Sequence, residues 1–137
     1  MKTVVSYLMV ISLLAVGCAV RGPKGQAELG QEISLSLGQN IAIEGENLAI
    51  RFDEIIEDSR CPKKVVCIWE GRVSVLVRIA GGASPYEMVL TQPGLSDEQA
   101  KATYLAYQFA YRVRPYPEAG KRITRDQYRL LLTVNKR

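Results

Sequence analysis

The chain of 137 residues contains no histidine, only three cysteines and a single tryptophan. Histidine is the usual general base for serine and cysteine nucleophiles, and it completes many zinc sites. Its absence, together with the lack of a spare thiol, excludes the Ser-His and Cys-His nucleophilic systems. We expect no catalytic residue, no bound metal and no cofactor.

Catalysis by two carboxylates needs no histidine, so the acidic residues require separate treatment. Four of them lie close together in sequence: Asp53, Glu54, Glu57 and Asp58. The same carboxylates could also build a calcium site with loop carbonyls, although their spacing matches no EF-hand. We favour a simpler arrangement, in which they lie on the solvent face of a strand and Asp58 caps the following turn. The sequence thus predicts a protein that is not an enzyme.

The amino-terminal residues have the composition of an export signal. Lys2 supplies a short positive start, residues 4–16 form an almost unbroken apolar run, and small residues precede Cys18. This run is too short to span a bilayer comfortably. Leu14-Ala15-Val16-Gly17-Cys18 resembles the lipobox of bacterial lipoproteins, in which the cysteine is diacylated and the preceding peptide is removed. We expect residues 1–17 to be a signal peptide and Cys18 to be lipidated; an ordinary cleaved signal with an incidental Cys18 is the alternative.

The segment that follows the expected lipidation site predicts a flexible tether and indicates the membrane to which the protein is anchored. Residues 18–31 are rich in Gly, Gln and charge, as in a flexible linker that holds a domain off a membrane. Ala19 is not the aspartate associated with inner-membrane retention, which favours the inner leaflet of the outer membrane, facing the periplasm. Loss of Lys2 with the signal lowers the formal charge from +4 to +3, because every acidic residue lies after residue 17. Outside the cytoplasm, so modest a positive charge does not indicate nucleic acid as a partner.

The remaining two cysteines predict a disulfide. If lipid occupies Cys18, then Cys61 and Cys67 are left six positions apart in an oxidising compartment. Closing a loop of that size should stabilise the fold by roughly 2 to 2.5 kcal/mol in the chain-entropy model. A metal site is the competing hypothesis, but no histidine exists to complete a zinc set.

From residue 32 onward, apolar residues alternate with polar ones, which indicates β-strands. We expect seven strands, at residues 33–37, 41–43, 48–53, 73–79, 86–90, 105–113 and 128–134. A β-bulge is expected where the alternation slips near residues 53–56, and a short helical turn near residues 96–102, where Ser96 and Gln99 could form a capping box. Together these features predict one all-β domain over residues 32–137, an antiparallel β-sandwich of immunoglobulin-like dimensions. A partly open barrel is the main alternative.

The loop between two of these strands holds both cysteines and the tryptophan. Extending the alternation of residues 73–79 backwards places Cys67 and Trp69 on the inward face, unless Gly71 breaks the phase. On this interpretation the indole packs beside the disulfide and covers it.

The same loop also brings a resemblance to a protein family. Asp58-Ser-Arg-Cys-Pro, then Cys67, Trp69 and Gly71, and later Tyr111-Arg-Val-Arg-Pro-Tyr-Pro117, resemble a family of small exported bacterial proteins and lipoproteins of uncharacterised function. The resemblance covers most of residues 32–134. It implies an extracytoplasmic β-domain and assigns no activity.

Charge is distributed unevenly along the chain. Residues 44–58 contain six acidic residues and one arginine, whereas residues 112–137 contain eight Lys or Arg and two acidic residues. If the two segments are neighbouring strands, the charges satisfy one another in cross-strand pairs, which we favour. If they are not, a basic patch suited to anionic envelope polymers or phospholipid headgroups results. The patch would comprise Arg112, Arg114, Lys121, Arg122, Arg125 and Arg129.

Two hypotheses for function follow. The first is a non-catalytic lipoprotein, anchored in the bilayer through Cys18, whose β-domain binds an envelope protein or anionic polymer. Its candidate contact residues are Arg60, Lys63, Lys64, Trp69, Arg112, Arg114 and Arg122. The second is an inhibitor of an exported hydrolase or protease, in which the disulfide loop presents Lys63-Lys64 as a rigid bait for a trypsin-like pocket. The simpler interpretation of the lysine pair, which we favour, is a solvated loop tip.

Overall fold

The computed structural model describes residues 25–95 and 98–137. The expected signal peptide, the lipidation of Cys18 and the first part of the expected tether therefore lie outside the described residues. Within those two ranges, no helix is long and apolar enough to cross a membrane.

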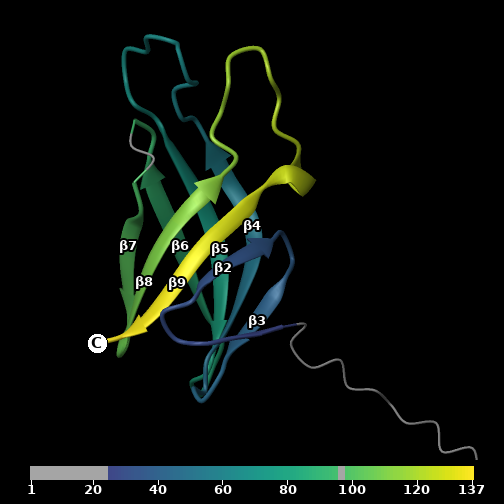
Figure 1. The fold of residues 1–137 in the computed structure, drawn as a ribbon, viewed down its shortest axis with the longest axis vertical. Helices are drawn as coiled ribbons and strands as arrows, with labels where there is room; N and C mark the ends of the chain where they lie inside the picture. The colour runs from purple at the N-terminus through teal and green to yellow at the C-terminus, as the bar shows by residue number, and fades with distance from the viewer. Residues whose placement is uncertain (1–24, 96–97) are drawn as a thin grey trace, which may run out of the picture.

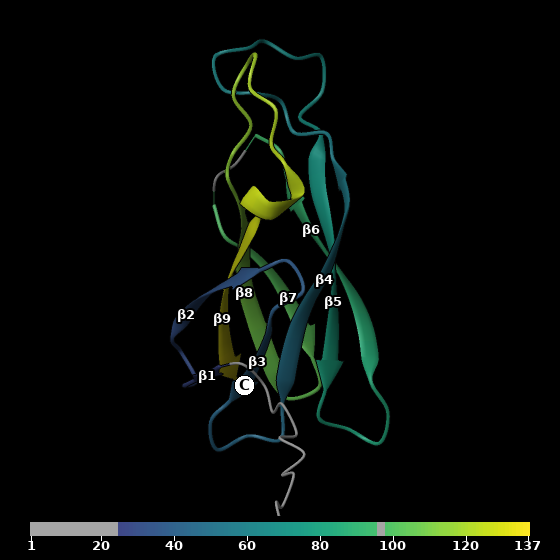
Figure 2. The same ribbon diagram turned by 90° about the vertical axis from the view of Figure 1, so that its right-hand side faces the viewer.

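The described residues form two packed β-sheets (Figures 1 and 2). In spatial order, the first sheet contains β1 (Gln26–Ala27), β3 (Asn40–Ile43), β4 (Ala49–Asp58), β5 (Arg72–Ala80) and β6 (Tyr86–Pro93). The second contains β2 (Glu32–Ser36), β9 (Arg129–Lys136), β8 (Tyr107–Arg114) and β7 (Ala100–Tyr104). The predicted all-β sandwich is confirmed: each expected strand is present, and β1 and β7 are additional.

The strands follow an up-and-down path. β3 to β6 pair consecutively in one sheet and β7 to β9 in the other, and β2 pairs with β9. Immunoglobulin domains instead use a Greek-key order. Because neighbouring strands alternate in direction, the β4–β5, β6–β7 and β8–β9 connections emerge at the same end of the sandwich (Figure 1). We call this the disulfide end and define it as residues 59–71, 94–95 and 115–124.

The core lies between the sheets and is built from the period-two residues of both. Phe52 and Val75 of the first sheet and Phe109 and Leu130 of the second are almost completely buried. Among the described residues, those of the core lie between Ala27 and Val134. The expected bulge is confirmed, since β4 shifts register against β5 between Phe52 and Glu54 and again between Ile55 and Glu57.

The tether boundary requires a correction, because the folded domain begins before residue 32. β1 pairs in parallel with β3, Ala27 is buried in the core, and the Gly30 amide donates a hydrogen bond of 2.8 Å to the Val134 carbonyl. Within residues 25–31, only Ala27 and Leu29 contribute apolar contacts to the core, and two residues are too few to produce a periodic pattern.

The helical turn expected near residues 96–102 is also wrong within the described part of that segment. Residues from Ala100 onward form strand β7, whose alternate residues pack on the core. The Gln99 side chain donates a hydrogen bond to Glu32 rather than reaching back to cap a helix. A short 3-10 turn occurs instead at Arg125–Gln127, where the Gln127 side chain accepts a hydrogen bond of 2.9 Å from the Thr124 amide.

Candidate functional site

The predicted disulfide is present at the base of the β4–β5 loop. Cys61 and Cys67 are joined with an S–S distance of 2.08 Å and a Cα–Cα distance of 6.0 Å. Cys61 is buried, whereas the residues after it project beyond the ends of the strands (Figures 1 and 2). The bond thus closes a protruding loop close to the sandwich.

A buried ion pair holds the start of this loop. The Arg60 side chain donates to both carboxylate oxygens of Asp58, from Nε at 2.8 Å and from Nη2 at 2.6 Å. The same carboxylate accepts hydrogen bonds from the Arg60 amide, as expected for a capped turn, and from the Tyr128 hydroxyl at 2.9 Å. Burial, and then the hydrogen bond to Asp58, raise the pKa of Tyr128 to about 12. The carboxylate at the end of β4 is therefore engaged on both oxygens.

Arg60 also joins the two sheets, which corrects its expected place on the contact surface. Its guanidinium is fully buried and donates hydrogen bonds of 3.0 Å to the carbonyls of Val113 and Pro115, at the end of β8. An arginine with four such bonds in the interior positions the loop against the second sheet and is not available to a partner.

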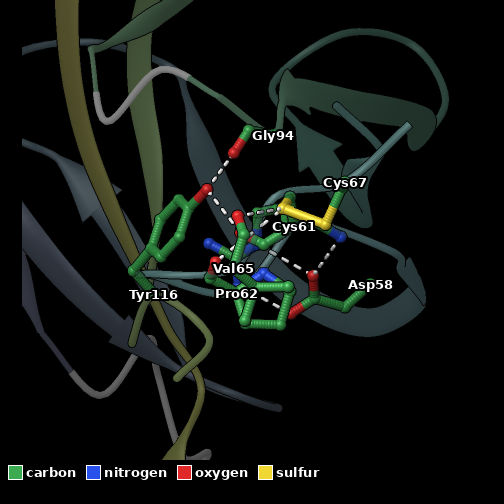
Figure 3. The surroundings of a disulfide bond; sticks show 8 residues. Asp58, Cys61, Pro62, Val65, Cys67, Gly94 and Tyr116 are labelled. Carbon is green, nitrogen blue, oxygen red and sulfur yellow. Dashed lines mark hydrogen bonds and ion pairs between the residues drawn. A yellow bond between two sulfur atoms is a disulfide. The ribbon is translucent and has the colours of Figure 1, made fainter. Parts of the chain in front are cut away.

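Tyr116 lies where the three connections meet. Its hydroxyl points at the carbonyl oxygens of Cys61, at 2.9 Å, and of Gly94 (Figure 3). The Arg60 guanidinium lies 5.2 Å and the Lys63 ammonium 5.7 Å from the ring centroid, which are cation–π distances. One side chain thus links the disulfide loop, the β6–β7 connection and the β8–β9 connection.

Gly71 explains why the expected burial of Trp69 is wrong. Gly71 has a φ of 67°, and a Cβ added there would lie 1.8 Å from the Ser59 carbonyl oxygen, so only glycine fits. This left-handed residue interrupts the alternation just before β5 begins at Arg72. The phase of β5 does not extend back through the loop, and 73% of the Trp69 surface is exposed.

The outer part of the loop presents an exposed apolar surface, which we call the apolar tip: Val66, Ile68 and Trp69. Val66 is fully exposed and Ile68 is 93% exposed. Leu95, on the neighbouring connection, is 70% exposed and lines a surface hollow of about 310 Å³ together with Val65 and Tyr116. Large apolar side chains exposed together on a soluble domain usually mark an interaction surface.

Four cations lie in the tip's own loop and on the neighbouring β8–β9 connection. We call this group the basic collar: Lys63, Lys64, Lys121 and Arg122. Lys63 and Lys64 line two surface hollows, one shared with Val65 and the other shared with Glu118. Lys121 and Arg122 line a third hollow, which also includes Glu118. The hydrogen bond from Lys121, and then the charges of Lys121, Lys63 and Lys64, lower the pKa of Glu118. That carboxylate is consequently ionised near neutral pH and offsets part of the collar's charge.

The remaining expected contact residues lie elsewhere. Arg112 and Arg114 are on the outer face of the second sheet, where Arg112 lies 3.6 Å from the carboxylate of Glu32. Asp53 and Glu57 of β4 pair instead with arginines of the first sheet, Arg78 and Arg72 respectively. The expected cross-strand pairs do not form, because β4 and β8 belong to different sheets. The two charged segments are joined instead by an ion pair in which the Lys136 ammonium lies 2.9 Å from the Glu46 carboxylate.

The clustered carboxylates do not converge on a common centre. Asp53 lies 2.8 Å from Arg51 and 3.2 Å from Arg78, and Glu57 and Asp58 each pair with their own arginine. Across residues 25–95 and 98–137, no group of three or more Cys, Asp or Glu side chains could hold a metal ion.

Sequence reasoning missed two contributors to the site. Tyr116 and Tyr128 organise the loop from positions more than 50 residues along the chain, and neither belongs to the cysteine motif. Tyr116, between Pro115 and Pro117, could have been noticed as an aromatic held by a rigid turn. No comparable pattern marks Tyr128.

No protein-family model, no curated protein and no solved structure matches the chain significantly. The class that fold and site define is a β-sandwich domain with a rigid, apolar and cationic loop surface at one end.

Proposed function

We propose that this chain is an acyl-anchored lipoprotein of the bacterial envelope, and that its β-sandwich is a non-catalytic module that binds its partner through the disulfide end. The anchor is the lipidated Cys18, and the location is the periplasmic face of the outer membrane. The resemblance of the loop motif to exported bacterial lipoproteins agrees with this assignment.

The observation that supports the proposal best is the exposure of the apolar tip on a loop that is rigidly held. The loop is closed by Cys61–Cys67, fixed at its start by Arg60 and packed against Tyr116. A surface ordered before binding does not lose that conformational entropy on binding, so more of the contact energy appears as affinity. Exposing Val66 and Ile68 in water has no stabilising role in the isolated domain.

The position of the anchor suits this arrangement. β1 pairs with the end of β3, so the described chain begins toward the end opposite the disulfide end (Figure 2). The seven residue-to-residue steps from Cys18 to Gly25 span at most about 25 Å when fully extended. An acyl chain on Cys18 would therefore attach the domain at one end and leave the disulfide end free for its partner.

Two measurements test the proposal. Mass spectrometry of the chain purified from its host should find an acylated Cys18 at the amino terminus. A chain of residues 19–137, which keeps every core residue of the described ranges, should co-sediment with isolated host envelopes. A Val66→Ser, Ile68→Ser variant should lose most of that binding. Leu105→Ser is the matched control, because Leu105 is 74% exposed at the opposite end. An unmodified amino terminus would refute the acyl anchor. Equal losses of envelope binding in the Val66→Ser, Ile68→Ser variant and in the Leu105→Ser control would refute the disulfide end as the binding surface.

The geometry of the lysine pair does not favour the protease-inhibitor alternative. A peptide bound in a protease cleft is normally extended and uses its backbone groups for pairing with the enzyme. Here the Lys63 amide already donates to the Pro117 carbonyl at 3.0 Å, and Lys64 has a φ of 63°. We expect the protein not to inhibit trypsin. Stoichiometric inhibition that disappears in a Lys63→Ala, Lys64→Ala variant would instead establish the alternative.

A further inference from the structure

We propose that the partner of the disulfide end is the surface of an anionic lipid bilayer other than the one that would hold the Cys18 anchor, because the tether enters the domain toward its opposite end. The apolar tip would enter the interface between headgroups and acyl chains, and the basic collar would contact lipid phosphates. This inference rests on the proposed function, because it names the partner of the same surface.

The shape of the tip favours a lipid surface over a protein. Val66 and Ile68 are exposed almost entirely, so no neighbouring side chain covers them. The energetically dominant residues of protein interfaces usually sit in well-packed pockets surrounded by other contacts. Side chains that project this far fit a deformable medium, and tryptophan beside them is the residue preferred at the membrane–water interface.

The charge around the tip specifies the headgroup. Lys63 and Lys64 come directly before the tip in the same loop, and Lys121 and Arg122 lie beside them across the hollows at Glu118. An apolar element with cations at its base matches the layers of an anionic membrane, in which apolar chains lie beneath phosphates. Each lysine or arginine near such a surface strengthens binding about fivefold.

The loop needs little rearrangement to dock. The disulfide, the Tyr116 hydroxyl and the buried Arg60 guanidinium hold its base, and Gly71 joins it to β5 without room for a side chain. The loop that bears the tip therefore keeps the same conformation when it meets a membrane.

Trp69 supplies a direct assay, because it is the only tryptophan in the chain. The chain of residues 19–137 is titrated with vesicles of phosphatidylcholine, with and without phosphatidylglycerol, while Trp69 emission is recorded. We expect a blue shift with the anionic vesicles, suppressed by salt, and binding to neutral vesicles that is weaker by roughly tenfold or more.

Two variants separate the apolar and the charged contributions, after circular dichroism has shown that each is folded. Val66→Ser, Ile68→Ser should weaken binding to anionic vesicles by at least about tenfold. Lys63→Gln, Lys64→Gln should weaken it roughly 25-fold. The controls change equivalent residues outside the disulfide end: Leu105→Ser, and Lys101→Gln with Arg137→Gln. Each control should alter binding by no more than about twofold, because these residues lie outside the docking surface.

The absence of a blue shift, or equal effects in variants and controls, would overturn lipid docking. Vesicles made from extracted envelope lipids distinguish this failure from failure of the proposed function. If intact envelopes bind the disulfide end and these vesicles do not, the partner is a protein or an envelope polymer, and the proposed function stands without the lipid. If neither binds, both proposals fail.

Discussion

Replacing Arg60 by methionine tests whether a buried arginine, rather than the disulfide alone, holds the disulfide end in place. The substitution keeps an aliphatic chain of similar length and removes the hydrogen bonds to Asp58, Val113 and Pro115. The Asp58 carboxylate would then be left largely buried without its cation. We therefore expect a large loss of stability, although Arg60 is a charged residue in a loop.

The magnitude follows from the cost of breaking a buried ion pair on one side, about 3–5 kcal/mol. For a domain of this size, such a loss should lower Tm by roughly 10–25 °C. Urea unfolding, followed by circular dichroism, measures the change as a shift in the midpoint at constant slope.

Arg51→Met is the matched control, because Arg51 forms an ion pair with Asp53 but its side chain is half exposed. An exposed pair contributes at most about 1 kcal/mol, so this variant should remain close to the wild type. If Arg60→Met costs no more than Arg51→Met, the arginine does not hold the two sheets together and our account of the loop is incorrect.

Three further substitutions test other parts of the same region. Gly71→Ala should destabilise the fold by roughly 2–4 kcal/mol more than Gly120→Ala in urea unfolding, because both glycines have positive φ but only at Gly71 would a Cβ meet backbone. Replacing Cys61 and Cys67 by serine should lower the free energy of unfolding by roughly 2–2.5 kcal/mol, and an unchanged value would refute a stabilising role for the bond. The pKa of Tyr128 is raised to about 12 in the folded state, so the hydroxyl's contribution to stability is complete below pH ~10 and is lost as the pH rises towards 12. The free energy of unfolding should therefore fall less steeply between pH ~10 and 12 in Tyr128→Phe than in the wild type. Parallel pH profiles of the two proteins would contradict this assignment.

The fold was largely predictable because its core depends on a local pattern. Each strand that spans the sandwich alternates inward and outward residues, as in β5 and β9, and this alternation is visible without any partner strand. β1 and β7 were missed for a common reason. β1 has two residues, and β7 inward positions are Ala100, Ala102 and Tyr104, so neither gives a strongly apolar alternation.

The candidate site was predictable only in its covalent part. Once Cys18 was assigned to lipid, counting the remaining cysteines was enough to predict a bond between Cys61 and Cys67. The orientation of Trp69 depended on one left-handed glycine, and the burial of Arg60 depended on carbonyls 53 and 55 residues away in sequence. Such contacts form only when the two sheets pack. The local sequence around Arg60 therefore looks the same as the sequence around an arginine in an exposed loop.

The most direct test of the account is photo-crosslinking in the living host, with a photoreactive amino acid incorporated in place of Ile68 or, as a control, of Leu105. Both side chains are strongly exposed. They belong to the β4–β5 connection and the β7–β8 turn, which lie at opposite ends of the sandwich (Figure 1). The account predicts a crosslinked adduct, to lipid or to another envelope component, from position 68 and little or none from position 105. Equal adducts from both positions, or none from position 68, would contradict the claim that the disulfide end is the contact surface.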